Sequence, residues 1–173
     1  MPELIFKGKE FVYNHHLTVP FRPLIPDSGK GIGEAHLDGN LIIHGDNLHA
    51  LKALLPMYAG KVDCVFIDPP YNTGQQTWRY SDDVNAPQIQ QWLRENPVDV
   101  DDMLRHDKWL CMMWPRLVLL RELLAETGTL WVTIDNGEGH RLRAVLDEVF
   151  GATNFLAEFV WKSRVSEDAR AKT

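Results

Sequence analysis

The sequence predicts an α/β fold built on a partial, doubly wound parallel sheet. Short segments rich in Val, Ile and Leu alternate with longer segments whose apolar residues recur every three or four positions. The chain has 173 residues, enough for one domain with a substantial core. A complete sheet of this type usually has more strands than the four found here, so we expect part of the sheet to be absent.

Four apolar segments are predicted to be strands, because each is short, rich in β-branched residues and bounded by turn residues. The strands are expected over 40–46, 61–68, 129–135 and 154–162. The second segment is almost continuously apolar, which is typical of a parallel strand buried on both faces. The first two strands and the segment between them therefore predict a right-handed βαβ unit.

Four segments between or beside these strands are predicted to be helices. They span 47–60, 87–95, 101–126 and 137–151. The first is expected to end before Pro56, and Pro115 is expected to kink or split the third, which Gly128 ends. In the last, Leu142, Val145, Leu146 and Val149 are expected to face the core.

The two ends of the chain are predicted to be irregular. Residues 1–40 are rich in proline and glycine, and we expect an arm that lies over the domain, anchored by Phe11, Tyr13 and Phe21. Residues 163–173 are polar and are expected to form a mobile tail.

The composition favours a soluble cytoplasmic protein. No apolar run is long enough to cross a bilayer, and the first sixteen residues are too charged for a secretory signal. Cys64 and Cys111 are far apart in apolar surroundings and suggest neither a disulfide framework nor a metal site. The net charge of −6 counts against a large nucleic-acid surface on this chain, although it leaves room for a local basic strip.

The turn after the second strand carries the strongest chemical signal. Asp68, Pro69, Pro70 and Tyr71 follow the strand at its carboxyl end, where open parallel sheets bind their ligands. Asp68 supplies a carboxylate, and the two prolines remove backbone donors so that the turn presents carbonyl oxygens. Tyr71 supplies an aromatic face for stacking. An Asp-Pro turn is also an ordinary exit from a strand, but Tyr71 and the polar residues after it favour a ligand site.

Acceptors beside a stacking ring suit the exocyclic amine of a nucleobase. The lone pair of that nitrogen is delocalised into the ring, and hydrogen bonds to a carboxylate and a carbonyl would free it to attack an electrophilic methyl group. Fixed acceptors would stabilise the positive charge that develops on the nitrogen. A base in a duplex would have to leave the stack to reach such a site.

These motifs resemble those of the β-class amino DNA methyltransferases, which use S-adenosylmethionine, and in particular the methylation subunits of type III restriction-modification systems. "DPPY" resembles their catalytic motif IV, and the upstream "HGDNLHAL" agrees with it. "HDKWLCMMWPRLVLLRELL", "GTLWVTIDNGE" and "NFLAEFVWK" resemble motifs V, VI and VIII, and "KGKEFVYNHHLTVPFR" resembles the N-terminal arm. The resemblance spans nearly the whole chain and implies a Rossmann-like methyltransferase sheet, with residues 41–162 as its catalytic half.

The resemblance implies roles for individual residues. Asp68 would bind the target amine with the Pro69 carbonyl as the second acceptor, and Pro70 completes the catalytic turn. Tyr71 would stack on a flipped adenine, and Asn72, Thr73 and Trp78 are expected to contact the substrate. Asp46 and Asp68 are expected to lie near S-adenosylmethionine. Asp135 either faces the pocket or caps the following helix.

The chain departs from the family in its glycine pattern. The glycine-rich "FxGxG" cofactor loop of the β class does not occur, and "GKGIG" at 29–33 does not follow an apolar strand. We therefore expect this chain to be the N-terminal catalytic portion of a larger enzyme, with the tail leading to an absent recognition region. The expected reaction is adenine-N6 methylation of DNA. Cytosine-N4 methylation and a non-catalytic module that binds DNA or a partner remain alternatives. Expected partners are DNA and either a second methyltransferase subunit or a restriction subunit.

Overall fold

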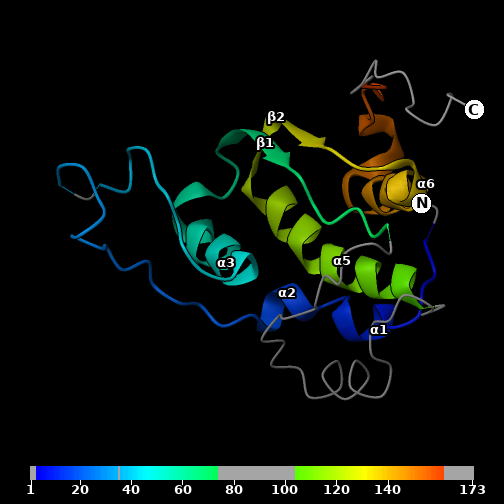
Figure 1. The fold of residues 1–173 in the computed structure, drawn as a ribbon, viewed down its shortest axis with the longest axis horizontal. Helices are drawn as coiled ribbons and strands as arrows, with labels where there is room; N and C mark the ends of the chain where they lie inside the picture. The colour runs from blue at the N-terminus through cyan, green and yellow to red at the C-terminus, as the bar shows by residue number, and fades with distance from the viewer. Residues whose placement is uncertain (1–2, 35, 74–103, 162–173) are drawn as a thin grey trace, which may run out of the picture.

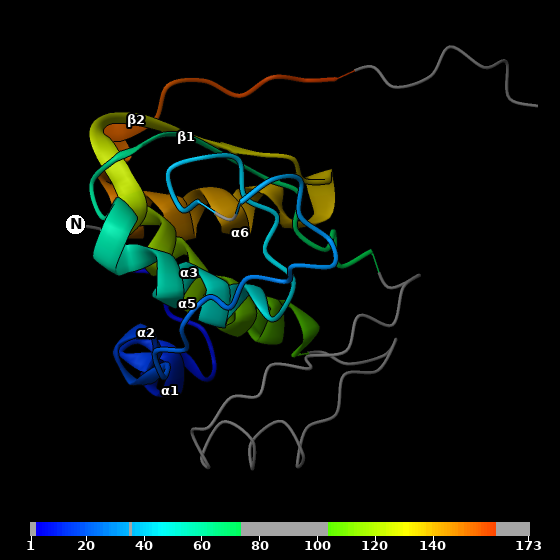
Figure 2. The same ribbon diagram turned by 90° about the vertical axis from the view of Figure 1, so that its left-hand side faces the viewer.

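A computed structural model describes residues 3–34, 36–73 and 104–161, where a pair of parallel strands packs on a group of helices. β1 (Val62–Ile67) pairs with β2 (Leu124–Val132), and α5 (Arg105–Leu123) lies between them in the chain. The predicted α/β class and the parallel pairing are confirmed. Figures 1 and 2 show α3, α5 and α6 on the same side of the strand pair, so the described residues place helices on one face and not on both.

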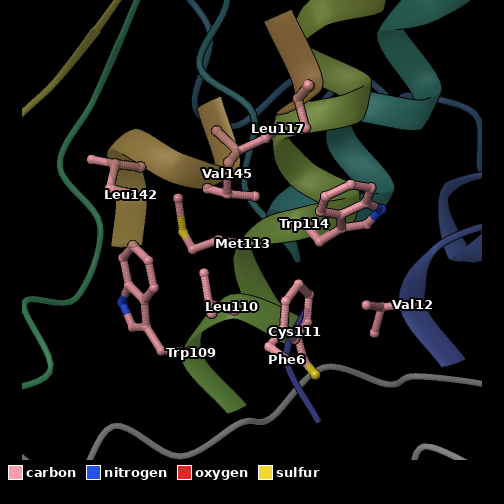
Figure 3. Close-up of a cluster of buried hydrophobic side chains, with 11 residues drawn as sticks. Phe6, Val12, Trp109, Leu110, Cys111, Met113, Trp114, Leu117, Leu142 and Val145 are labelled. Atoms are coloured by element: carbon pink, nitrogen blue, oxygen red, sulfur yellow. The ribbon is translucent and has the colours of Figure 1, made fainter. Parts of the chain in front are cut away.

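Helix α5 forms the centre of the core. Its side chains pack against α6 (Asn136–Leu146), the π-helical turn Asp147–Gly151 and the N-terminal arm, as Figure 3 shows. Leu142, Val145 and Val149 are buried and Leu146 is partly buried, which confirms the predicted inward face of this segment. The other buried members of the cluster are Phe6, Val12, Trp109, Leu110, Cys111, Met113, Trp114 and Leu117. This cluster therefore joins α5, α6 and the N-terminal arm, and a second, smaller cluster of Val19, Leu48 and Leu119 joins α3 to α5.

Neither proline interrupts its helix, so the predicted end before Pro56 and the predicted split at Pro115 are both wrong. Helix α5 continues through Pro115, and α3 (Asn47–Tyr58) continues through Pro56 to its last turn. A proline deprives the preceding turn of a hydrogen bond. In α5 this leaves the Cys111 carbonyl without its helical donor, while Arg116 Nη1 donates to the next carbonyl, that of Met112, over 2.7 Å. Pro115 is also fully buried, so packing holds the helix together across it.

The N-terminal arm is partly helical and is fastened by a buried ion pair. α1 (Lys9–Val12) and α2 (His15–Thr18) lie beside α5 in Figure 1, where an irregular arm was predicted. The Lys9 ammonium lies 2.7 Å from the Glu148 carboxylate and also donates to the Leu4 carbonyl, with both charged side chains largely buried. The Tyr13 ring stacks on Trp114.

Two of the aromatic anchors predicted for this arm are found, and one is not. Phe11 packs against the core cluster, and the Tyr13 ring stacks on Trp114 of α5. Phe21 is 58% exposed, so its predicted role as an anchor is wrong.

Two predicted strands do not form. Residues 40–44 and 155–161 run without strand pairing among the described residues, and several of their apolar side chains are exposed, including Ile42, Leu156 and Phe159. A strand needs a neighbour to receive its hydrogen bonds, and β1 and β2 are the strands that this part of the chain provides. The described residues therefore do not form the βαβ unit predicted around α3, and the parallel pair encloses α5 instead.

The side chains of the strand pair are also more exposed to solvent than predicted. Phe66 is 68% exposed and its pairing partner Trp131 is 44% exposed, while Ile67 and Val132 pack toward the core. The Phe159 ring stacks on Trp131 on the face away from the helices. The prediction that this strand is buried on both faces is thus wrong for the described residues.

Strand β2 begins earlier than predicted because helix α5 stops at Leu123. Leu124 is already extended, and Gly128 lies within β2 and does not end the helix. Between Leu124 and Thr129 the pairing is irregular, and the chain passes very close to β1. A Cβ on Gly128 would lie 2.6 Å from the Val62 carbonyl oxygen and 2.7 Å from Leu124 Cδ2, so only glycine fits.

Some predictions lie outside the described residues. These are the helix over 87–95, the tail 163–173 and the substrate contact of Trp78. Cys64 and Cys111 are both free. None of the helices described has the length and apolar character needed to cross a membrane.

We predict that Gly128→Ala destabilises the protein. The added methyl group would collide with backbone and side-chain atoms of both strands, and overpacking of this kind typically costs about 1–3 kcal/mol. Urea unfolding followed by circular dichroism would measure the change in the free energy of unfolding.

Gly139→Ala is the matched control. Gly139 lies in helix α6, and the nearest neighbour of an added Cβ would be Ile134 Cγ2 at 3.9 Å. Alanine favours a helix over glycine, so this variant should be at least as stable as the wild type. Equal stability of Gly128→Ala and the wild type would contradict the close approach described above.

Candidate active site

The register of the strand pair brings two polar residues together at one edge of the sheet. Ile67 lies opposite Val132, and the Thr133 N–H donates to the Ile67 carbonyl over 3.1 Å. The next residue of β1 is Asp68, so it leaves the sheet beside Thr133. The Thr133 hydroxyl donates to Asp68 Oδ1 over 2.5 Å. This edge is the carboxyl end of both strands, where parallel sheets carry their sites.

Hydrogen bonds hold the Asp68 carboxylate in its charged form. The Thr133 hydroxyl contributes most and the Tyr71 side chain contributes next, and together they hold the pKa of Asp68 below its ordinary value. The carboxyl group is exposed, so burial does little to oppose them. Asp68 therefore presents an ionised acceptor to solvent at the edge of the sheet.

The prolines give the turn a fixed shape. Both peptide bonds before them are trans. The Pro70 carbonyl accepts a hydrogen bond from Trp109 Nε1 over 2.6 Å, and Trp109 is fully buried in α5. The Pro69 carbonyl receives no hydrogen bond from the described residues, which leaves this oxygen as the acceptor beside Asp68.

The next three residues divide between solvent and the interior. Tyr71 is 41% exposed, so part of its ring is accessible, and Thr73 is exposed. Asn72 is buried, has a left-handed backbone with φ 55°, and donates from Nδ2 to Glu138 Oε1 over 2.6 Å. The structure thus brings together Asp68, Pro69, Pro70 and Tyr71 and turns the Asn72 side chain inward.

Two other aspartates act as helix caps. Asp46 Oδ1 accepts from the N–H groups of Leu48 and His49 and begins α3. Asp135 Oδ1 accepts from the Gly137 N–H over 2.6 Å and begins α6, which matches the capping alternative for this residue. In the part of the chain that the structure describes, no three His, Cys, Asp or Glu side chains lie close enough to hold a metal ion.

Comparison with protein families agrees with this geometry. The model of the family described as DNA methylase, with the short name N6_N4_Mtase, matches residues 62–172, which include both strands, α5, α6 and the Asp68 turn. The chain belongs to the DNA methylase family. Its candidate site lies at the start of the matched region.

Several curated relatives of this chain are subunits of type III restriction-modification enzymes. The Mod subunit of EcoP15I from Escherichia coli is 38% identical over 135 residues, which is 72% of this chain and 21% of the relative. The StyLTI Mod subunit from Salmonella typhimurium is 32% identical over 178 positions, 96% of this chain and 27% of the relative. The EcoPI Mod subunit from Escherichia phage P1 is 39% identical over 69% of this chain and 20% of the relative. The chain thus spans about a fifth to a quarter of the length of these relatives.

Sequence reasoning missed three residues of the candidate site. Thr133, Trp109 and Glu138 each hold one point of the turn, at Asp68, Pro70 and Asn72. Thr133 was open to prediction, because the strands over 61–68 and 129–135 were predicted to be parallel and their ends meet at one edge. Trp109 and Glu138 lie on helices, and their contacts depend on tertiary packing that no local pattern reveals.

We predict that Thr133→Val raises the pKa of Asp68. The substitution keeps the shape of the side chain but removes the hydroxyl that stabilises the carboxylate. The pKa of Asp68 is lowered in the wild type, so its carboxyl group stays ionised to a lower pH than in the variant. A carbon-detected NMR titration of Asp68 Cγ would measure the change.

Thr129→Val is the control for this titration. Thr129 lies on the same strand, and its hydroxyl accepts from Trp131 Nε1 with no contact to Asp68. The Asp68 titration should be unchanged in this variant. An Asp68 pKa in Thr133→Val equal to that of the wild type would show that this hydroxyl does not tune the carboxylate.

Proposed function

We propose that this chain carries the amine-activating site of a cytoplasmic DNA adenine-N6 methyltransferase with a Rossmann-like sheet. The single observation that supports this most is the ionised, exposed Asp68 carboxylate beside the Pro69 carbonyl and the Tyr71 ring. Membership of the DNA methylase family supports the reaction type. The choice of adenine rests on the resemblance of "DPPY" to the adenine-specific β class.

Asp68 and the Pro69 carbonyl would accept the two N–H groups of the target amine. Such hydrogen bonds draw the nitrogen lone pair out of the ring and toward an electrophile. S-adenosylmethionine supplies a methyl group on a positively charged sulfur. A nitrogen–carbon bond forms as the carbon–sulfur bond breaks and its electron pair goes to sulfur, and the nitrogen then releases one proton to Asp68 or solvent. Fixed acceptors stabilise the charge on nitrogen without having to reorganise.

Tyr71 and its neighbours would hold the base. The exposed part of the Tyr71 ring offers a face for a flipped purine, and the Tyr71 side chain also helps to lower the pKa of Asp68. Thr73 is exposed next to it and remains a proposed substrate contact, as does Trp78. A substrate contact from Asn72 Nδ2 would compete with its bond to Glu138.

The proposed cofactor contacts are Asp46 and Asp68. Oδ1 of Asp46 caps α3, so Oδ2 is the oxygen that would face a ligand. The glycine cluster at 29–33 lies in an exposed loop, and a Cβ on Gly33 would meet nothing within 4 Å, so no close backbone approach requires it. The residues of this chain therefore fit the methyl-receiving side of the site better than a cofactor loop.

The proposed partners are DNA and a restriction subunit, with a second methyltransferase subunit as the other candidate. The relatives named as Mod subunits of type III restriction-modification enzymes support this choice. The net charge of −6 argues that this chain supplies few of the contacts to DNA phosphates.

The first test is Asp68→Asn in the full-length gene product. The amide keeps one acceptor oxygen but loses the charge, and we expect the methylation rate to fall by about 100- to 1,000-fold, as when one group that stabilises a transition state is removed. Digestion of the DNA to nucleosides and mass spectrometry would measure N6-methyladenine. N4-methylcytosine as the sole product would show the alternative specificity.

Asp63→Asn is the matched control, because Asp63 is an exposed aspartate in β1, five residues before the turn. Its methylation rate should stay within about twofold of the wild type, as expected for a surface substitution away from the site. Undiminished methylation by Asp68→Asn would refute the proposed role of the carboxylate.

A second test concerns the cofactor. We expect the 173-residue chain to bind S-adenosylmethionine weakly or not at all, because it offers carboxylates but no glycine-rich loop after a strand. Isothermal calorimetry would measure the affinity. A dissociation constant in the micromolar range would contradict this expectation and would place a complete cofactor site in these residues.

A further inference from the structure

A buried carboxylate, that of Glu138, contacts the catalytic turn from the interior of the protein. Glu138 is in the first turn of α6 and is fully buried. Its Oε1 accepts hydrogen bonds from Asn72 Nδ2 over 2.6 Å and from His106 Nδ1. The Arg141 guanidinium lies 3.8 Å from Oε2, which receives no hydrogen bond from the described residues. A buried charge is costly unless its partners satisfy it, so the hydrogen bonds from Asn72 and His106 and the nearby Arg141 charge together hold this side chain in place.

The hydrogen bonds fix the tautomer of His106. Arg105 Nε donates to His106 Nε2 over 3.3 Å, so Nε2 is an acceptor and the ring proton lies on Nδ1. Nδ1 can then donate to Glu138 Oε1. The carboxylate thereby links the start of α5, the start of α6 and the catalytic turn.

Asn72 has a backbone conformation that needs support. Its φ of 55° lies in the left-handed region, which asparagine adopts more readily than most residues but still at a cost. Such conformations persist where surrounding contacts hold them, and they concentrate at functional sites. The bond from Asn72 Nδ2 to Glu138 is such a contact, and Tyr71 is the residue immediately before it.

We propose that Glu138 is a positioning residue of the site. Through Asn72 it holds the carboxyl-terminal side of the turn, while Trp109 holds Pro70 and Thr133 holds Asp68. The turn is thus fixed at three points from three different elements, and Glu138 sets the place of Tyr71. Its effect on methylation rests on the function proposed above, whereas its effect on the turn does not.

Kinetics of the full-length gene product test the positioning role. Loss of the Glu138 contact should displace the turn without removing any group that touches the substrate. We expect Glu138→Ala to lower kcat by roughly 10- to 100-fold, as for a misplacement of about 1 Å, with KM for DNA and for S-adenosylmethionine within about twofold of the wild type. Glu138→Gln keeps an acceptor oxygen and should retain more activity than Glu138→Ala.

Asn72→Gly tests the same contact from the other side. Glycine adopts the left-handed conformation freely, so this variant removes the amide without straining the turn. We expect kcat to fall, and the double variant with Glu138→Ala should lose no more than Glu138→Ala alone. Glu126→Gln removes the same charge from an exposed position and should leave kcat unchanged.

Several kinetic outcomes would overturn the proposal. These are full kcat in Glu138→Ala, a loss confined to KM, equal losses in Glu138→Gln and Glu138→Ala, or losses that multiply in the double variant. A wild-type protein that methylates no DNA would refute the proposed function instead, and a structural measurement then decides the positioning role.

Fluorine NMR of the protein labelled with 5-fluorotryptophan provides that measurement. Trp109 donates to Pro70, so its resonance reports on the turn, and its absence in Trp109→Phe identifies it. We expect this resonance to shift or broaden in Glu138→Ala and in Asn72→Gly. The Trp114 resonance should stay in place, since its Nε1 donates to Tyr13 of the arm. An unchanged Trp109 resonance in both variants would show that Glu138 does not position the turn.

Discussion

The parallel register of β1 and β2 is the constraint on which the candidate site depends. Ile67 pairs with Val132, so Asp68 and Thr133 leave the two strands side by side. A shift of one residue would turn every side chain of one strand to the opposite face and separate the hydroxyl from the carboxylate. The irregular pairing near Gly128 lies at the other end of the strands, so the register is regular where the site needs it.

Helix α5 connects this edge to the hydrophobic core. Trp109 is fully buried, and a buried indole needs a partner for its N–H group. The partner is the Pro70 carbonyl, so the same residue fills the core and fixes the turn. On its other side α5 carries the N-terminal arm, which the pair of Lys9 and Glu148 holds in place. Glu148 lies directly after α6, so this ion pair ties the arm to α6 as well as to α5. The arm, α5, α6 and the turn therefore pack as one unit.

Local signals in the sequence predicted the turn and much of the helical structure. The apolar run before Asp68, the cap at Asp135 as one of two alternatives for that residue, and the inward face of 137–151 are properties of short segments, and the structure agrees with them where it describes them. Pairing and packing are not local. The segments 40–46 and 154–162 have the composition of strands but no neighbour among the described residues.

The same reasoning explains the errors at the prolines and the missed residues. Pro115 was expected to kink or split α5, yet the helix is continuous through it, because the packing of its buried side chains holds it together despite the lost hydrogen bond. Glu138 looked like an ordinary acidic residue in a first helical turn. Its importance follows from Asn72, which lies 66 positions earlier in the chain and meets it only in the folded protein.

The way in which Asp68 is kept ionised suits the proposed chemistry. A base that enters the site would exclude water from the carboxylate, and desolvation raises the pKa of an acid. Hydrogen bonds from Thr133 and Tyr71 act in the opposite direction and are present before any ligand arrives. They approach from the sheet and from the turn, which leaves the exposed side of the carboxylate for the amine. The donors therefore preserve the charge at the moment when the substrate would otherwise reduce it.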